Sequence, residues 1–168
     1  MQEYELETPR RPVRIAIAAA EFNRFITDQL LEGACSALES HGVPAEQRVL
    51  AWVPGAYELP LAADRLLAAG KADAVIALGA VIRGGTPHFD YVAGDCSRGL
   101  MDVGLRHGKP VIFGVLTTDT IEQALERAAR DQGNKGHDVA MAALQMVALR
   151  DRVGDRVADR VSEGGKGP

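Results

Sequence analysis

The chain has 168 residues and a net charge of −4, with acidic and basic residues interspersed along its length. This length is enough for one domain with a buried core. The mixed charge argues against a nucleic-acid-binding surface, and no apolar run approaches the length of a membrane span. We therefore expect neither nucleic-acid nor membrane partners.

The predicted elements alternate between short apolar strands and amphipathic helices. In chain order, we expect strands at residues 13–20, 48–53, 74–80 and 110–116, and helices through residues 26–38, 59–69, 88–107, 121–128 and 140–147. A capping box of Asp119 and Glu122 is expected to begin the fourth helix. This alternation predicts a parallel sheet covered on both faces, which makes the protein a single-domain three-layer α/β sandwich.

The two ends of the chain differ from this pattern. Residues 1–12 are expected to form an extended arm, residues 13–150 the α/β domain, and residues 151–168 a helical extension with a disordered tail. The extension repeats Asp-Arg-Val at a spacing of four residues, which fits a frayed end of the last helix or a partner-binding helix. We expect disorder from Ser162 onward.

The N-terminus and the cysteines bear on the compartment. Residues 1–11 are polar and acidic, so we expect no signal peptide and a cytoplasmic protein. Cys35 and Cys96 lie in separate helical patterns, and we expect both to be buried small side chains rather than a disulfide or a metal pair.

The most informative segment is the end of the third predicted strand. There, an apolar run passes into Gly84-Gly85-Thr86 and then His88 at a helix start. Glycines let backbone N–H groups approach an oxyanion, and a helix N-terminus favours negative charge. Histidine titrates near neutral pH and can carry protons. Because ligands of parallel sheets bind beyond the strands' carboxyl ends, we expect an active-site edge here.

Several candidate residues also have simpler interpretations. His88 could be an ordinary helix-start residue, and Phe22 could cap the core rather than stack on a planar ring. Arg127 could be a solvated helix residue or a phosphate clamp. Glu58 could stabilise a helix start or accept hydrogen bonds from a polyol, and Lys135 could be a turn residue.

The sequence also lacks the patterns of several ligand sites. It has no Cys-x-x-Cys, no histidine pair at helical spacing, no Walker loop and no Gly-x-Gly-x-x-Gly after the first strand. These absences argue against a metal site, a Walker-type nucleotide site and a Rossmann-type dinucleotide site.

Several blocks in order resemble a known family. They are Phe22-Asn23, Val53-Pro54-Gly55-Ala56-Tyr57-Glu58, residues 79–90, residues 113–117, Glu126-Arg127 and Asn134-Lys135-Gly136. Together they make residues 13–149 similar to the 6,7-dimethyl-8-ribityllumazine synthases. The resemblance implies a flavodoxin-like strand order and an N-terminal arm that pairs with a neighbouring subunit.

The resemblance also implies a reaction that uses no metal and no organic cofactor. The family condenses 5-amino-6-(D-ribitylamino)uracil with 3,4-dihydroxy-2-butanone 4-phosphate, releasing phosphate and water, in the penultimate step of riboflavin biosynthesis. Two other classes stay open: a relative that binds flavin or lumazine without catalysis, and a structural shell protein.

The resemblance assigns roles to residues of this chain. Phe22 and Asn23 would bind the pyrimidine, with Phe22 stacking on its ring. The ribityl chain would be held by Ala56, Tyr57 and Glu58, and the ring would be enclosed by Ala80, Val81, Ile82 and Phe113. Gly85, Thr86 and Arg127 would bind phosphate, and His88 would move protons. Lys135 would support the phosphate end by pairing with Glu126.

Family members assemble as homopentamers, and some close into a 60-subunit icosahedral shell. The short link at residues 130–136 favours the shell. The resemblance further implies that Phe22, Glu58 and His88 share a site with Phe113, Arg127 and Lys135 of the neighbouring subunit.

Overall fold

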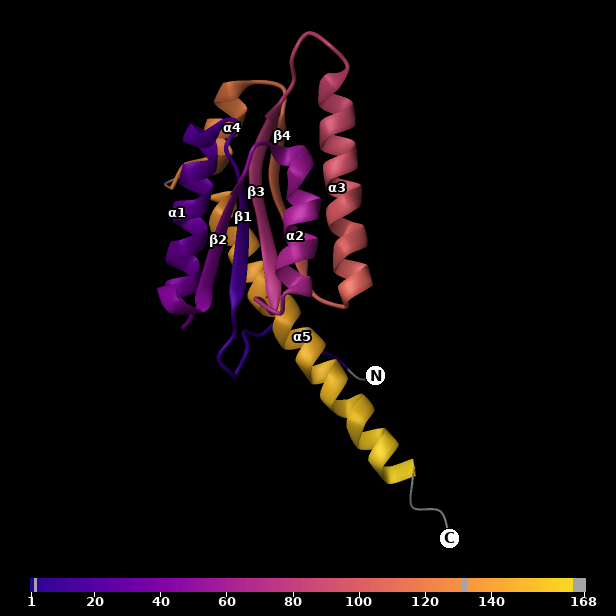
Figure 1. The fold of residues 1–168 in the computed structure, drawn as a ribbon. Coiled ribbons are helices and arrows are strands. Elements are labelled where there is room, and N and C mark those ends of the chain that lie inside the picture. Colours follow the sequence, from indigo (N-terminus) through magenta and orange to yellow (C-terminus); the bar gives the residue numbers. More distant parts are fainter. Residues whose placement is uncertain (2, 131–132, 165–168) are drawn as a thin grey trace.

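The computed structural model describes residues 1, 3–130 and 133–164, with side chains described as far as residue 154. Its centre is one parallel sheet of four strands in the order β2-β1-β3-β4 (Figure 1). The strands are β1 (Ile15–Ala20), β2 (Arg48–Val53), β3 (Ala74–Ile82) and β4 (Val111–Thr118). The predicted flavodoxin-like order is confirmed.

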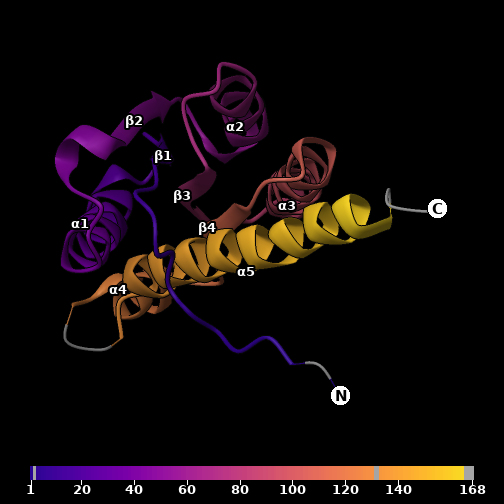
Figure 2. The ribbon, with the colours of Figure 1, turned by 90° about the horizontal axis from the view of Figure 1, so that it is seen from below.

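Five helices cover the two faces of the sheet, which confirms the predicted three-layer sandwich (Figure 2). One face carries α1 (Arg24–Ser40), α4 (Ile121–Ala128) and α5 (Lys135–Gly164), and the other carries α2 (Leu59–Ala68) and α3 (His88–His107). Single 3-10 turns at Ala45–Gln47 and Ala56–Glu58 precede β2 and α2.

The two central strands, β1 and β3, are apolar at every position because both of their faces are covered. In β1, Ile15 and Ile17 pack against α1, α4 and α5, whereas Ala16 and Ala18 pack against α2 and α3. Successive side chains of a strand point to opposite faces, so one short strand supplies both cores. The larger side chains lie on the three-helix side.

The start of α4 differs from the predicted capping box by one residue. Thr120 is the N-cap, and its hydroxyl accepts a hydrogen bond from the Gln123 N–H at 3.2 Å. The Gln123 amide oxygen accepts in turn from the Asp119 N–H at 2.9 Å. The expected pair of Asp119 and Glu122 is therefore wrong, because a threonine in extended conformation already occupies the capping position.

The last helix is longer than the sequence predicts. α5 begins at Lys135 and passes without interruption through the Asp-Arg-Val repeat to Gly164, so it projects beyond the sheet (Figure 1). It includes Ser162 to Gly164, where we expected disorder; residues 165–168 of that segment lie outside the described residues. The α/β domain and the extension therefore share one helix.

The N-terminal arm contacts this helix of its own chain. Arg11 pairs with Asp151 at 2.8 Å, and Arg152 pairs with Glu7 at 3.0 Å. Pairing of the arm with a neighbouring subunit stays a prediction.

The two cysteines lie on opposite sides of the sheet, on α1 and α3, and both are free thiols, as predicted. Cys96 is fully buried, and burial raises the pKa of its thiol to about 11. Cys35 is only half-buried, contrary to the expectation.

None of the helices in the described part of the chain is both long and apolar enough to cross a bilayer.

Candidate functional site

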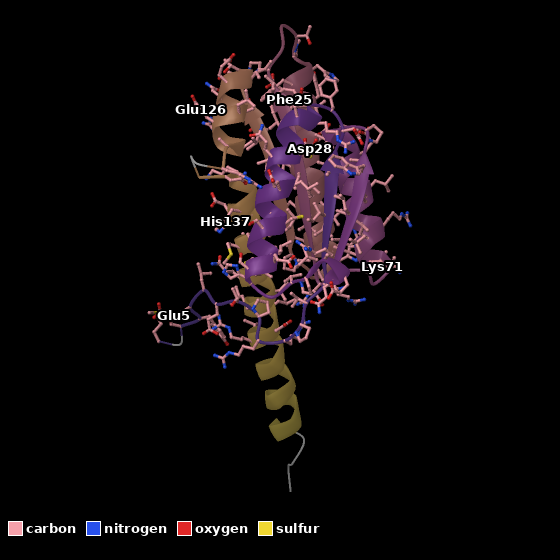
Figure 3. The ribbon with its side chains drawn as sticks, turned by 90° about the vertical axis from the view of Figure 1, so that its left-hand side faces the viewer. Glu5, Phe25, Asp28, Lys71, Glu126 and His137 are labelled. Atoms are coloured by element: carbon pink, nitrogen blue, oxygen red, sulfur yellow. The ribbon has the colours of Figure 1, made fainter. Side chains whose placement is uncertain are left out.

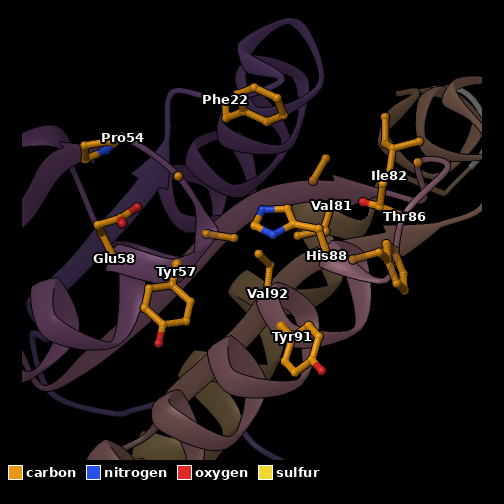
Figure 4. Close-up of a pocket in the computed structure, with 15 residues that line it drawn as sticks. Phe22, Pro54, Tyr57, Glu58, Val81, Ile82, Thr86, His88, Tyr91 and Val92 are labelled. Atoms are coloured by element: carbon orange, nitrogen blue, oxygen red, sulfur yellow. The ribbon is translucent and has the colours of Figure 1, made fainter.

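A pocket of about 710 Å³ opens at the carboxyl ends of β1, β2 and β3. Three connections meet there: the turn before α1, the turn before α2 and the loop from β3 to α3 (Figure 4). Its lining comprises Phe22, Pro54, Gly55, Ala56, Tyr57, Glu58, Ala80, Val81, Ile82, Gly84, Thr86, His88, Phe89, Tyr91 and Val92. The three helices that follow all point their N-termini toward this edge, so their dipoles favour negative charge in the pocket.

Hydrogen bonds tie two of these connections to one another and to β3. The Glu21 N–H donates to the Val53 carbonyl at 2.8 Å, and the Phe22 N–H donates to the Pro54 carbonyl at 3.1 Å. Asn23 adopts a left-handed conformation with φ 59°, and its amide donates to the Ala80 carbonyl at 2.9 Å. Asn23 therefore holds the pocket rim and does not itself line the pocket.

The left-handed conformation at Asn23 has a consequence for Phe22. Asparagine tolerates this backbone region better than other residues with a side chain, and it reverses the chain immediately after β1. Phe22 is 72% exposed at this reversal, and its ring lies over the pocket (Figure 4). An exposed aromatic face here is suited to stacking on a planar ligand.

The loop from β3 to α3 offers backbone donors without partners. Among the described residues, Gly84, Gly85 and Thr86 take part in no hydrogen bond. A Cβ added to either glycine would meet no atom within 4 Å, so the space beside the loop is open. Free N–H groups at the start of a helix form a site for an anion.

His88 is the first residue of α3 and is exposed to solvent in the pocket. Figure 4 shows its imidazole extending from the helix start toward the side of the pocket that Tyr57 and Glu58 form. Its ring makes no hydrogen bond to any other described residue. An imidazole in this position is free to exchange protons with a bound ligand.

Glu58 precedes α2 and directs a carboxylate into the same pocket. A Cβ on residue 55 would lie 3.3 Å from the Glu58 Oε2 atom. The absence of a side chain at Gly55 therefore leaves space for the Glu58 carboxylate. Within the described chain this carboxylate has no cationic partner. It can accept hydrogen bonds from hydroxyl groups of a ligand, and its position also suits the dipole of α2, so both sequence-based interpretations fit.

Arg83 connects the loop to two neighbouring elements. Its Nε lies 3.0 Å from Asp119 before α4, and its Nη2 lies 3.2 Å from Asp90 in the first turn of α3. Its guanidinium also stacks over the Phe89 ring at 4.1 Å from the centroid. The hydrogen bonds to the Asp119 and Asp90 carboxylates raise the pKa of Arg83, which keeps the guanidinium charged.

Besides Asn23 and Gly85, which lie beside the pocket without lining it, four of the predicted site residues lie away from it. Arg127 and Glu126 are on α4, on the opposite side of the sheet from α3; Figure 3 shows Glu126 on that outer side. Phe113 lies on the edge strand β4, level with Ala77 of β3 and well before the carboxyl ends of the strands. Lys135 donates to Asp138 of its own helix at 2.8 Å, and its pairing with Glu126 stays a prediction.

The structure adds pocket residues that the sequence analysis did not name. Tyr91 and Val92 lie three and four positions after His88, so they share its face of α3. That spacing was available in the sequence once His88 was taken as a helix start. Gly85, by contrast, was predicted as a site residue but does not line the pocket. It lies in the loop between the lining residues Gly84 and Thr86.

The fold and the pocket define the class of this protein. It is a parallel three-layer α/β protein with a small-molecule pocket at the carboxyl ends of its strands, the usual place for ligands in such sheets. Residues 12–151 match the family model of 6,7-dimethyl-8-ribityllumazine synthase, and the chain belongs to this family. The family consists of transferases of riboflavin biosynthesis.

Proposed function

We propose that the protein condenses 5-amino-6-(D-ribitylamino)uracil with 3,4-dihydroxy-2-butanone 4-phosphate to 6,7-dimethyl-8-ribityllumazine, with release of phosphate and water. Membership of the family supports the reaction class. The main structural support for this proposal is the pocket of this chain. It combines an aromatic face, a carboxylate, unpaired loop N–H groups and an imidazole.

Residues that line the pocket or lie beside it divide the two substrates between them. Phe22 stacks on the pyrimidine ring, and Glu58 accepts hydrogen bonds from the ribityl hydroxyls. Gly85 and Thr86 bind the phosphate through their N–H groups at the start of α3. This arrangement places the ketone between the pyrimidine amine and His88.

His88 is the proton carrier in this proposal. The amine of the pyrimidine attacks the ketone, and water leaves as the imine forms. Phosphate then leaves, and the ring closes when the second amine attacks the remaining carbonyl group and a second water is lost. Each step moves a proton, and an exposed imidazole at the pocket wall can accept and return it. Holding the two substrates in contact supplies a further part of the rate enhancement.

We further propose that a neighbouring subunit completes the pocket. The lining contains no lysine or arginine, although the substrate carries a phosphate. Arg127 lies on the far side of the sheet from α3, and among the described residues its guanidinium bonds only to the Gln123 carbonyl of its own helix, at 3.0 Å. In a homopentamer, and in a 60-subunit shell built from it, Arg127, Phe113 and Lys135 of one subunit would reach the pocket of the next. There Arg127 would clamp the phosphate, Lys135 would support the phosphate end, and Phe113 would help to enclose the ring.

Turnover with both substrates tests the proposed reaction. The purified protein is mixed with the two substrates, and phosphate and lumazine are quantified together. We expect equal amounts of both products, at a rate well above the uncatalysed condensation. Binding of the product without release of phosphate would favour a non-catalytic relative, and assembly without either would favour a shell protein.

A further inference from the structure

We propose that Arg83 is a positioning residue: through Asp119, Asp90 and Phe89 it fixes the β3–α3 loop in the shape in which Gly85 and Thr86 bind phosphate. The proposal rests on the proposed function of this pocket. It assigns to Arg83 a role in ordering the site without contact to substrate.

The contacts of Arg83 bracket the loop on both sides. Its backbone N–H donates to the Thr118 carbonyl at 2.9 Å, which anchors the point where the loop leaves β3. Its side chain reaches over the loop to Asp90 and Phe89 in the first turn of α3, where the loop ends. The second carboxylate, on Asp119, holds the guanidinium against the connection from β4 to α4.

The loop needs such an anchor because its own residues provide none. Gly84 and Gly85 have the widest conformational freedom of any residue type, and no hydrogen bond of the described chain restrains them or Thr86. An anion site built from backbone N–H groups loses affinity when those groups must be ordered on binding. A loop that is fixed beforehand avoids that cost.

The competing interpretation is that these contacts are ordinary surface ion pairs. The Arg83 side chain is 44% exposed, and exposed ion pairs contribute little to global stability. The two interpretations therefore predict different effects of removing the guanidinium. Loss of a positioning residue weakens phosphate binding and loosens the start of α3, whereas loss of a surface pair leaves both unchanged.

The test compares Arg83→Gln, Arg83→Lys and a matched control, Arg98→Gln. Arg98 lies on the same helix as Asp90 and forms an exposed ion pair with Asp95 at 3.8 Å, so its variant removes similar chemistry away from the loop. Three quantities are measured on each assembled variant: the Kd of inorganic phosphate, the KM of each substrate, and amide hydrogen exchange in a peptide covering residues 88–92.

For Arg83→Gln we expect the phosphate Kd and the KM of the phosphorylated substrate to rise by about tenfold, since small misplacements in a preorganised site have effects of this size or larger. The KM of the pyrimidine should change by less than about twofold, because Phe22 and Glu58 lie on other connections. Exchange at residues 88–92 should accelerate, since the Asp90 N–H to Pro87 carbonyl bond closes this turn. Arg83→Lys should recover part of each effect, because one ammonium lacks the fork that spans two carboxylates.

The proposal is overturned if Arg83→Gln matches Arg98→Gln in phosphate Kd and in exchange, or if it weakens both substrates equally. Asp119→Asn is a second variant that leaves Arg83 in place; it must weaken phosphate binding in the same direction. Failure of the wild type to turn over the substrates would contradict the proposed reaction instead, and the phosphate and exchange measurements would still decide the role of Arg83.

Discussion

At the scale of single residues, His88 has the most direct chemical role in the proposed mechanism. It is exposed in the pocket, at the first position of a 20-residue helix and beside unpaired loop amides. The condensation itself is intrinsically feasible once both substrates are held together, so proton transfer is one contribution among several.

We expect His88→Ala to lower kcat by about 100-fold or less, the low end of what general acid–base catalysis contributes. Steady-state kinetics with both substrates at saturation measures this, and product binding by the variant serves as the control for an intact pocket. A correctly folded variant with no detectable turnover would mean that His88 does more than transfer protons.

Arg127→Ala is expected to act on one substrate only. Because its guanidinium would bind the phosphate, the KM of the phosphorylated substrate should rise by about tenfold or more, while the KM of the pyrimidine changes little. Kinetics with each substrate varied in turn measures the difference. Equal increases for both substrates would point to a structural role of Arg127 in α4.

A pocket residue could be predicted from the sequence when it directly follows the end of a single predicted strand. Phe22, Glu58 and His88 each follow a strand, and parallel strands bring their carboxyl ends to one edge. The contacts of Arg83 were not predictable, because Asp119 comes from a different connection. The Thr120 cap was missed because Asp119 is an equally good capping residue by type.

At the scale of elements, the crossing of α1 and α5 depends on very small side chains. A Cβ on Gly136 would overlap the Leu30 carbonyl, and one on Gly33 would overlap the Asn134 side chain. The buried Asn134 amide links the helices further, donating to the Gln29 and Ala128 carbonyls. Such contact leaves no room for even one methyl group.

We therefore expect Gly136→Ala to lower the free energy of unfolding by about 3 kcal/mol, the upper part of the usual range for overpacking. Gly154→Ala, on the same helix, is the matched control, since a Cβ there meets nothing within 4 Å. It should be neutral or stabilise by up to about 1 kcal/mol. Urea titration of both variants measures the difference, and equal effects would contradict the packing argument.

The elements themselves were largely predictable, and their ends were less so. Apolar runs and helical spacing placed all four strands and five helices. β3 continues two residues beyond the predicted end because Val81 and Ile82 pair with Thr117 and Thr118 of β4. Pairing between distant strands cannot be inferred from the local pattern of either one. The presence of a glycine at position 99, inside α3, is likewise explained only by the fold. A Cβ there would lie 2.8 Å from the Pro60 side chain of α2.

At the scale of the whole molecule, the pocket is open and lacks a cation of its own. A neighbour that supplies Arg127 would both exclude water and balance the phosphate charge, which strengthens every electrostatic contact within the site. The central claim is therefore that one active site is shared between two subunits, with His88 from one and Arg127 from the other.

Co-assembly of two impaired variants tests this claim most directly. His88→Ala and Arg127→Ala chains are unfolded together, reassembled and compared with each variant reassembled alone. Random mixing creates interfaces that carry both wild-type residues, so we predict activity above the average of the separate variants, in proportion to those interfaces. Activity equal to that average would place both residues in the site of a single subunit and would contradict the account.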